Sequence, residues 1–134
     1  MRVICNKKLG SDLPQHYYDW GFTEQTEFSL KLGMVYMIYA MCLLKNGILN
    51  YLIIGDEGQN PAWYPAILFR VTESSVPKCW QYAFWGTNFE NEVIAVWGYD
   101  ELVNHEEHFD ELSEMEHSAL DVFNMRKEEI EAEA

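Results

Sequence analysis

The strongest structural signal in this chain lies in residues 34–54, whose sequence is MVYMIYAMCLLKNGILNYLII. Two runs rich in β-branched and aromatic residues, Met34 to Leu44 and Ile48 to Ile54, flank Lys45-Asn46-Gly47. Asn-Gly suits a two-residue type I′ turn, because that turn needs a positive φ at both central residues. The segment therefore predicts a β-hairpin. Both alternating sets of the first run are apolar, which indicates a strand covered on both faces.

The residues after this hairpin continue as short strands separated by turns. Residues 55–61 are mostly turn formers and predict an exposed loop. Further strands are expected at 63–71, 79–85 and 93–97, with Pro65 marking an edge or an irregular start. Strands at this spacing are typical of an antiparallel β-meander or a partial β-barrel.

From Tyr99 onward the spacing of apolar residues changes to three, four and seven, which is one face of an amphipathic α-helix. The residues on this stripe are Leu102, Phe109, Leu112, Met115 or Glu116, Ala119 or Leu120, Phe123 and Ile130. Asp100 and the pair Asn104 and Glu107 resemble helix starts, so we expect a short helix at 99–104 and a long one near 106–130. The expected fold class is α+β, with one domain over 1–134, a β-rich body at about 1–97 and an acidic helical segment at about 99–130.

The net negative charge of the chain comes from the C-terminal part, from Glu90 onward, most of which is this helical segment. The formal net charge is −13; fifteen carboxylates lie from Glu90 onward against Arg126 and Lys127, whereas the preceding residues carry seven acids and seven bases. Such a field repels nucleic acid and anionic membranes and attracts basic partners. A basic protein partner is therefore expected, with no direct binding to nucleic acid or membrane.

Cysteine usage and the N-terminal sequence predict a cytoplasmic protein. Cys5, Cys42 and Cys79 are odd in number and lack zinc or disulfide spacing, which indicates buried free thiols in a reducing compartment. The first eight residues lack the apolar core of a signal peptide. The longest apolar run, residues 33–44, is shorter than the ~18 residues that a membrane span needs.

Histidines and carboxylates near residue 110 raise the question of a metal site. The candidates are His105, Glu106, His108, Asp110 and His117. Ligands three or four residues apart share a helix face, but this pattern is not the two-His-plus-Glu motif of metalloproteases. His105 falls on the apolar stripe, where a packed, hydrogen-bonded imidazole is expected. We therefore expect neither a metal nor a cofactor.

Catalytic and nucleic-acid-binding motifs are weakly represented. Asp56 and Glu57, in a loop near Trp63 and Tyr64, form the best enzyme-like grouping, but the chain has no nucleophile-base spacing, phosphate loop or dinucleotide fingerprint. No catalytic residue is expected. Five tryptophans could stack on single-stranded nucleic acid, but the lysine and arginine side chains that would bind its phosphates are scarce. Most of these tryptophans are expected in the core.

Four segments together suggest a family. LGMVYMIYA (32–40), YLIIGD (51–56), WYPAILF (63–69) and VWGYDEL (96–102) resemble the small acidic immunity proteins encoded beside bacterial polymorphic toxins, including the Rhs-type, type VI secretion and contact-dependent inhibition systems. The resemblance covers about Phe28 to Glu116. It implies a noncatalytic antitoxin that binds its cognate toxin domain in the cytoplasm and covers the active site or substrate surface.

Exposed loop residues and the acidic helix are the expected contact surface with a basic toxin. The expected partner-binding residues are Asp56, Glu57, Trp63, Tyr64, Glu106, Glu107, Asp110, Glu111 and Glu114. Two alternatives stay open: a small enzyme with an Asp/Glu-lined aromatic pocket, and an acidic adaptor protein that mimics nucleic acid.

Overall fold

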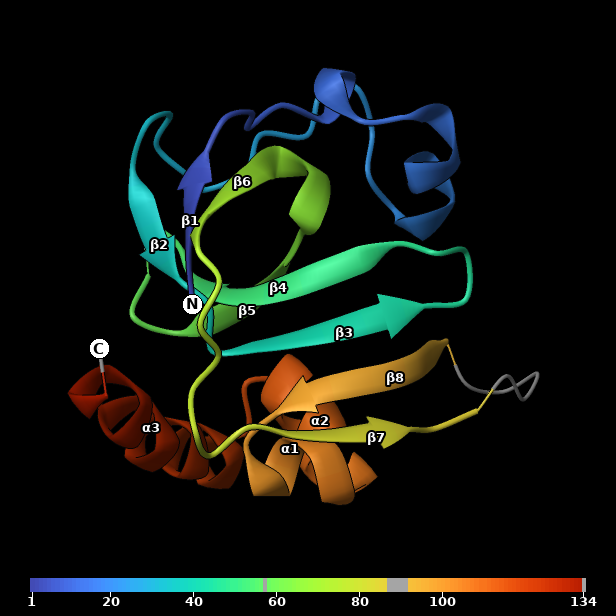
Figure 1. Ribbon diagram of the computed structural model, residues 1–134. Coiled ribbons are helices and arrows are strands. Elements are labelled where there is room, and N and C mark those ends of the chain that lie inside the picture. Colours follow the sequence, from blue (N-terminus) through green and yellow to red (C-terminus); the bar gives the residue numbers. More distant parts are fainter. Residues whose placement is uncertain (57, 87–91, 134) are drawn as a thin grey trace.

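The strands of the protein form two antiparallel sheets, followed by C-terminal helices (Figure 1). The computed structural model describes residues 1–56, 58–86 and 92–133. The three-stranded sheet has the order β2 (Val35–Met37), β1 (Arg2–Cys5), β6 (Phe69–Glu73). The five-stranded sheet has the order β5 (Pro61–Pro65), β4 (Leu49–Ile54), β3 (Ala40–Leu44), β8 (Val93–Gly98), β7 (Gln81–Phe84). The expected α+β class is confirmed, and the described strands do not close into a barrel.

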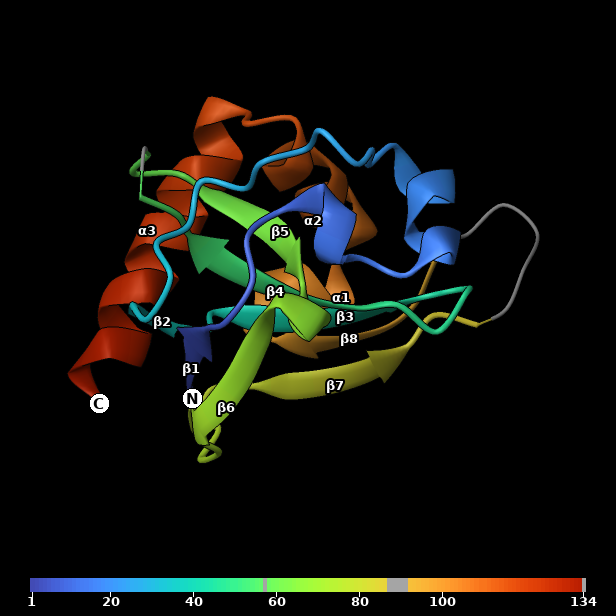
Figure 2. The ribbon, with the colours of Figure 1, turned by 90° about the horizontal axis from the view of Figure 1, so that it is seen from above.

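Helices and single helical turns complete the described chain. The 3₁₀ turns are η1 (Gly10–Asp12), η2 (Gln15–Trp20) and η3 (Ala66–Leu68), and the α-helices are α1 (Asp100–Asn104), α2 (Glu106–Ser113) and α3 (His117–Ala132). Figure 2 shows α2 and α3 on one side of the five-stranded sheet. No helix in the described ranges is both long enough and apolar enough to cross a membrane.

The first arm of the expected hairpin is divided between the two sheets, so the prediction of one continuous strand is wrong. β2 pairs with β1, whereas β3 pairs with β4 and β8. Between them, the Ile38 N–H donates to the Met1 carbonyl and the Tyr39 N–H donates to the Leu52 carbonyl. Ile38 is fully buried and Tyr39 nearly so. Apolar residues fill both alternating sets because the chain crosses here from one covered sheet to the other.

The turn of this hairpin also differs from the type I′ prediction. The Leu44 N–H donates to the Ile48 carbonyl at 2.9 Å and the Gly47 N–H donates to the Leu44 carbonyl at 2.9 Å, so the loop has three residues. Gly47 has a φ of 78°, whereas Asn46 is not left-handed. A three-residue hairpin loop needs only its last residue in the left-handed region, and Gly47 supplies it.

The expected strand at 63–71 is likewise split. Pro65 ends β5, η3 follows, and β6 then enters the three-stranded sheet. β5 is an edge strand, as Pro65 predicted. The two sheets pack together through the rings of Tyr51 on β4 and Phe69 on β6, whose centroids lie 5.9 Å apart.

The C-terminal helices bury the expected apolar stripe. Its buried members are Leu102, Phe109, Leu112, Ala119, Phe123 and Ile130. Gly98 permits close contact of β8 with both α1 and β3, since a Cβ there would lie 3.2 Å from Cδ2 of Leu102 on α1 and 2.9 Å from the Cβ of Ala40 on β3. The Phe123 ring of α3 packs on Tyr39 at 5.4 Å, which fixes α3 against the five-stranded sheet.

The long helix expected at 106–130 is broken between α2 and α3. The Met115 N–H donates to the Leu112 carbonyl at 3.1 Å and the Glu116 N–H donates to the Glu111 carbonyl at 2.9 Å. Met115 has a φ of 60°. This is a Schellman ending, with a methionine at the left-handed position that glycine usually occupies. Nothing in a helical periodicity count reveals such an ending.

The thiols are free, as predicted from their spacing. Cys5 and Cys42 are buried, and Cys79 is half-buried. Burial raises the pKa of Cys42 to about 12, so this thiol stays protonated and unreactive.

Candidate functional site

The acidic helix expected from the sequence is α2, and its buried side determines which side chains reach solvent. His108, Phe109 and Leu112 face the interior. All the carboxylates of α2 and its C-cap are exposed, namely Glu106, Glu107, Asp110, Glu111 and Glu114. We call these five residues the acidic face. The structure thus brings together the five expected partner-binding residues that belong to the helical segment.

The carboxylates of the acidic face have no cationic partner among the described residues. Arg126 binds Glu101 and Glu129, and Lys127 binds Glu131. Lys8 binds Glu27, and Arg2 binds Glu73. Ion pairs therefore offset part of the charge of α1 and α3, whereas no described base offsets the charge of the acidic face.

The position of these charges along α2 is only partly favourable. Glu106 and Glu107 lie in the first turn, where the helix dipole stabilises negative charge. Glu111 and Glu114 lie at the opposite end, where the dipole is unfavourable. Glu106 and Asp110, four residues apart, also repel each other. The acidic face is therefore electrostatically strained in the isolated protein.

An aromatic cluster anchors α2 to the sheet. Phe109 stacks on Trp63 with centroids 5.2 Å apart, and Trp85 meets Phe109 edge-on at 5.3 Å. Trp63 belongs to β5 and Trp85 directly follows β7, and these are the two edge strands of the five-stranded sheet. The sheet therefore curls around α2, and Trp63 lies next to the acidic helix as part of this cluster.

A hollow of about 400 Å³ opens beside this cluster. We call it the α2 hollow; it is lined by Trp85, Glu92, Val93, Glu106, Phe109, Asp110 and Ser113. Its carboxylates therefore belong to two places in the fold: Glu92 directly precedes β8, and Glu106 and Asp110 lie on α2. Sequence reasoning missed Trp85, Phe109 and Glu92 as site residues, because their proximity depends on how the sheet curls.

Hydrogen-bonding contacts hold both α2 and the preceding α1 in place. The Tyr99 hydroxyl lies 2.7 Å from Nε2 of His108, and both side chains are buried. The Trp85 indole N–H donates to the Val103 carbonyl at 3.0 Å. Burial lowers the pKa of His108, with the nearby Glu101 opposing this shift and His105 adding to it. The imidazole is thereby favoured in its neutral form.

His108, rather than His105, is the packed histidine. His105 is exposed and joins α1 to α2, where its backbone leaves the helical region. The break restarts the helical phase, and His108 then falls on the buried face beside Phe109. In the part of the chain that the structure describes, no three His, Cys, Asp or Glu side chains converge as a metal site.

Asp56, which sequence analysis grouped with Trp63, lies elsewhere. Asp56 accepts a hydrogen bond of 2.6 Å from the Tyr36 hydroxyl, and its own N–H donates to the Ser29 carbonyl. Burial and this bond raise the pKa of Tyr36 to about 12. Asp56 lines a hollow with Lys8 and Glu27. Its contacts are those of a residue that fastens the loop before β2.

Tyr64 also departs from the expected footprint. Tyr64 lies in β5, not in a loop, and only 8% of its surface is exposed, so the prediction of an exposed contact residue is wrong. It packs against Phe28 because its side chain points to the sheet face opposite Trp63. Glu57 lies outside the described residues.

The tryptophans are mostly boundary residues. All five are half-buried, and Trp20, Trp63, Trp80 and Trp85 pack against the hydrophobic core, so the expectation that most lie in the core is met in part. Trp97 packs on Tyr82 at 5.2 Å, and Tyr82 and Phe84 of β7 are largely exposed.

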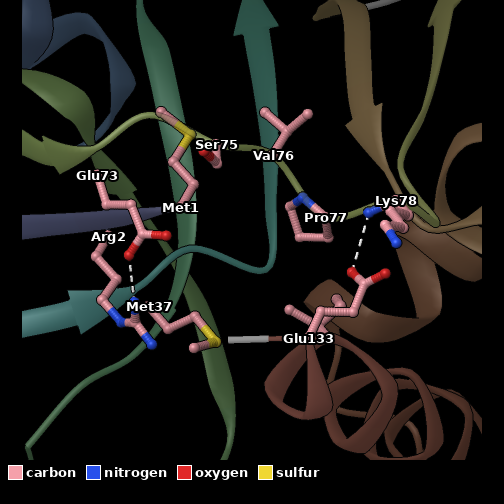
Figure 3. A pocket seen from close by; sticks show the side chains of 10 residues that line it. Met1, Arg2, Met37, Glu73, Ser75, Val76, Pro77, Lys78 and Glu133 are labelled. Carbon is pink, nitrogen blue, oxygen red and sulfur yellow. Dashed lines mark hydrogen bonds and ion pairs between the residues drawn. The ribbon is translucent and has the colours of Figure 1, made fainter.

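A second hollow, of about 210 Å³, lies where the end of α3 meets the three-stranded sheet (Figure 3). Arg2 and Glu73 form an ion pair across it, and the Lys78 N–H donates to the Glu133 carboxylate at 2.9 Å. The ion pair ties β1 to β6, and the hydrogen bond fastens the end of α3 to the segment between β6 and β7. We therefore assign this hollow a structural role.

Comparisons of the chain with protein-family models, curated proteins and solved structures find no significant match. The candidate functional site accordingly consists of the acidic face, the aromatic cluster of Trp63, Trp85 and Phe109, and the α2 hollow between them.

Proposed function

We propose that this protein is a noncatalytic binding protein of the immunity type, which neutralises a basic toxin domain in the cytoplasm by covering its active site or substrate surface. The observation that carries the proposal is the acidic face. Its five carboxylates are exposed, and none forms an ion pair with a described base. The resemblance of four sequence segments to immunity proteins supplies the biological setting.

The energetics of the acidic face favour a cationic partner. Like charges four residues apart in a helix cost about 0.2–0.5 kcal/mol per pair, so the isolated α2 carries a small penalty. A basic surface laid against it would turn repulsion into attraction. The main gain is in rate, since complementary potentials accelerate encounter and fix orientation.

A titration tests this function. The toxin domain encoded by the neighbouring reading frame is purified, and its activity is measured while this protein is added. A protein that acts by occlusion works by stoichiometry, so activity should vanish near one equivalent. Asp56→Asn should still protect, because the Asp56 carboxylate is engaged with Tyr36.

A charge-reversal variant tests the surface. E106K/E107K/D110K/E114K should slow association about tenfold or more at low salt and flatten its salt dependence. The matched control D12K/D19K/E24K/E128K changes the net charge equally, at exposed acids away from α2. Protection by much less than one equivalent would contradict occlusion. Equal slowing by both variants would remove the acidic face from the interface.

A further inference from the structure

The α2 hollow is lined by two kinds of side chain. Trp85 and Phe109 supply aromatic surface, and Glu92, Glu106 and Asp110 supply carboxylates. The other lining residues are Val93 and Ser113, so no base lines the hollow among the residues that the structure describes. Its volume, about 400 Å³, is at the lower end of the range of small-ligand pockets.

The charges of the hollow converge from two elements. Glu92 directly precedes β8, while Glu106 and Asp110 lie one turn apart on α2. A group placed between them would meet carboxylates on both sides. Such a group must be positively charged, because an anion or a neutral polar group would leave the repulsion in place.

The aromatic wall is preorganised. The Trp85 indole is tethered to the Val103 carbonyl, and Phe109 is held by stacking on Trp63. Rings that do not reorganise lose little entropy when a ligand packs on them. A flat cation suits such a wall better than a compact one.

We propose that the α2 hollow is an arginine pocket, which receives one guanidinium side chain from the basic partner. Guanidinium is planar, weakly hydrated, able to pack on aromatic rings and able to bond carboxylates in pairs, whereas a lysine ammonium is compact and strongly hydrated. This inference deepens the proposed function and rests on it for the identity of the partner. The pocket itself can be tested without that partner.

The probe is a blocked pentapeptide with one central arginine flanked by glycines, added to the isotope-labelled full chain. Nuclear magnetic resonance should show saturable shifts of the Trp85 indole and of the amides of 106–113. Lysine should bind more weakly, and citrulline, the neutral analogue of arginine, should not bind.

Two double variants on the same helix separate the pocket from the general field. E106Q/D110N removes two charges that line the hollow and should weaken arginine-peptide binding about fivefold or more. E107Q/E114Q removes two charges of the same helix that lie outside the lining and should have a smaller effect. Equal weakening by both, equal binding of citrulline, or no saturable shift would overturn the pocket.

Failure of the pocket is distinguishable from failure of the proposed function. If the toxin domain is neutralised stoichiometrically and E106Q/D110N protects as well as E107Q/E114Q, the pocket is wrong and the function stands. If the arginine peptide binds as expected but the toxin domain is not neutralised, the function is wrong and the pocket stands.

Discussion

His108 is the residue in which packing and acid-base chemistry meet most directly. Among the described residues, His108 is the one polar or charged side chain in the buried class, with 8% of its surface exposed. Its ring contacts Tyr99, and the charged or titratable groups near it are Glu101 and His105. Because burial lowers the pKa of His108 and favours the neutral imidazole, we expect the packing of α2 to depend on pH.

Acidification should weaken the protein through His108. The pKa is lower in the folded protein than the ordinary value of about 6.5. The unfolded chain therefore binds the proton first, and stability is lost as pH falls below about 6.5 and through the lower folded-state pKa. Thermal melting between about pH 7 and pH 5 should show a steeper loss for wild type than for His108→Gln. Parallel curves would show that His108 does not contribute, since carboxylates titrate in both proteins.

The residues of the site divide into those that local sequence could predict and those that it could not. The acidic face followed from composition and helical spacing, because a helix face is a local property. Trp85 and Glu92 reached the hollow only through the curl of the sheet, which no local pattern encodes. The prediction that Tyr64 is exposed was wrong because neighbouring residues of a strand point to opposite faces of the sheet, and the face opposite Trp63 is buried here.

At the scale of elements, apolar periodicity predicted the class of structure better than its boundaries. The strands near residues 40–54, 61–65, 81–84 and 93–98 were found, as was the short helix α1. The first hairpin arm contains no turn former where it crosses between sheets, since Ile38 and Tyr39 are apolar. The break after α2 carries no glycine. Both boundaries are set by tertiary packing.

Met115 offers a test of the break between α2 and α3. A residue with a side chain in the left-handed region is strained by roughly 1 kcal/mol relative to glycine. Met115 is exposed, so replacing it removes little packing. Met115→Gly should therefore leave stability unchanged or raise it by up to about 1 kcal/mol in denaturant unfolding. Met125→Gly, at an exposed position inside α3, should instead destabilise by about 1 kcal/mol. Equal losses at both positions would contradict the Schellman ending.

The molecule consists of two antiparallel sheets followed by three C-terminal helices. The residues from Glu90 onward, which include these helices, carry its net charge. Ion pairs tie α3 to α1 through Arg126 and Glu101, at 2.8 and 3.0 Å. Glu101 has a lowered pKa because of this bond. The remaining acids of the helical segment outnumber its bases, so repulsion exceeds attraction across this side of the fold.

Salt should consequently stabilise the isolated protein. The screening length falls from about 30 Å at 0.01 M to about 10 Å at 0.1 M, which weakens repulsion among exposed carboxylates. The melting temperature should rise with sodium chloride over this range. E106K/E107K/D110K/E114K, whose net charge is closer to zero, should rise less. A melting temperature that falls with salt would mean that the ion pairs outweigh the repulsion.

The contact of Phe109 with two tryptophans has an optical consequence. Indole emission changes in colour and intensity with the polarity and motion of its surroundings, and Trp63 and Trp85 are two of the five indoles in the chain. Any event that shifts α2 alters both environments at once, whereas the other three indoles lie outside this contact. The protein therefore carries an intrinsic fluorophore pair at the element that we expect to meet its partner, and association can be followed without a label.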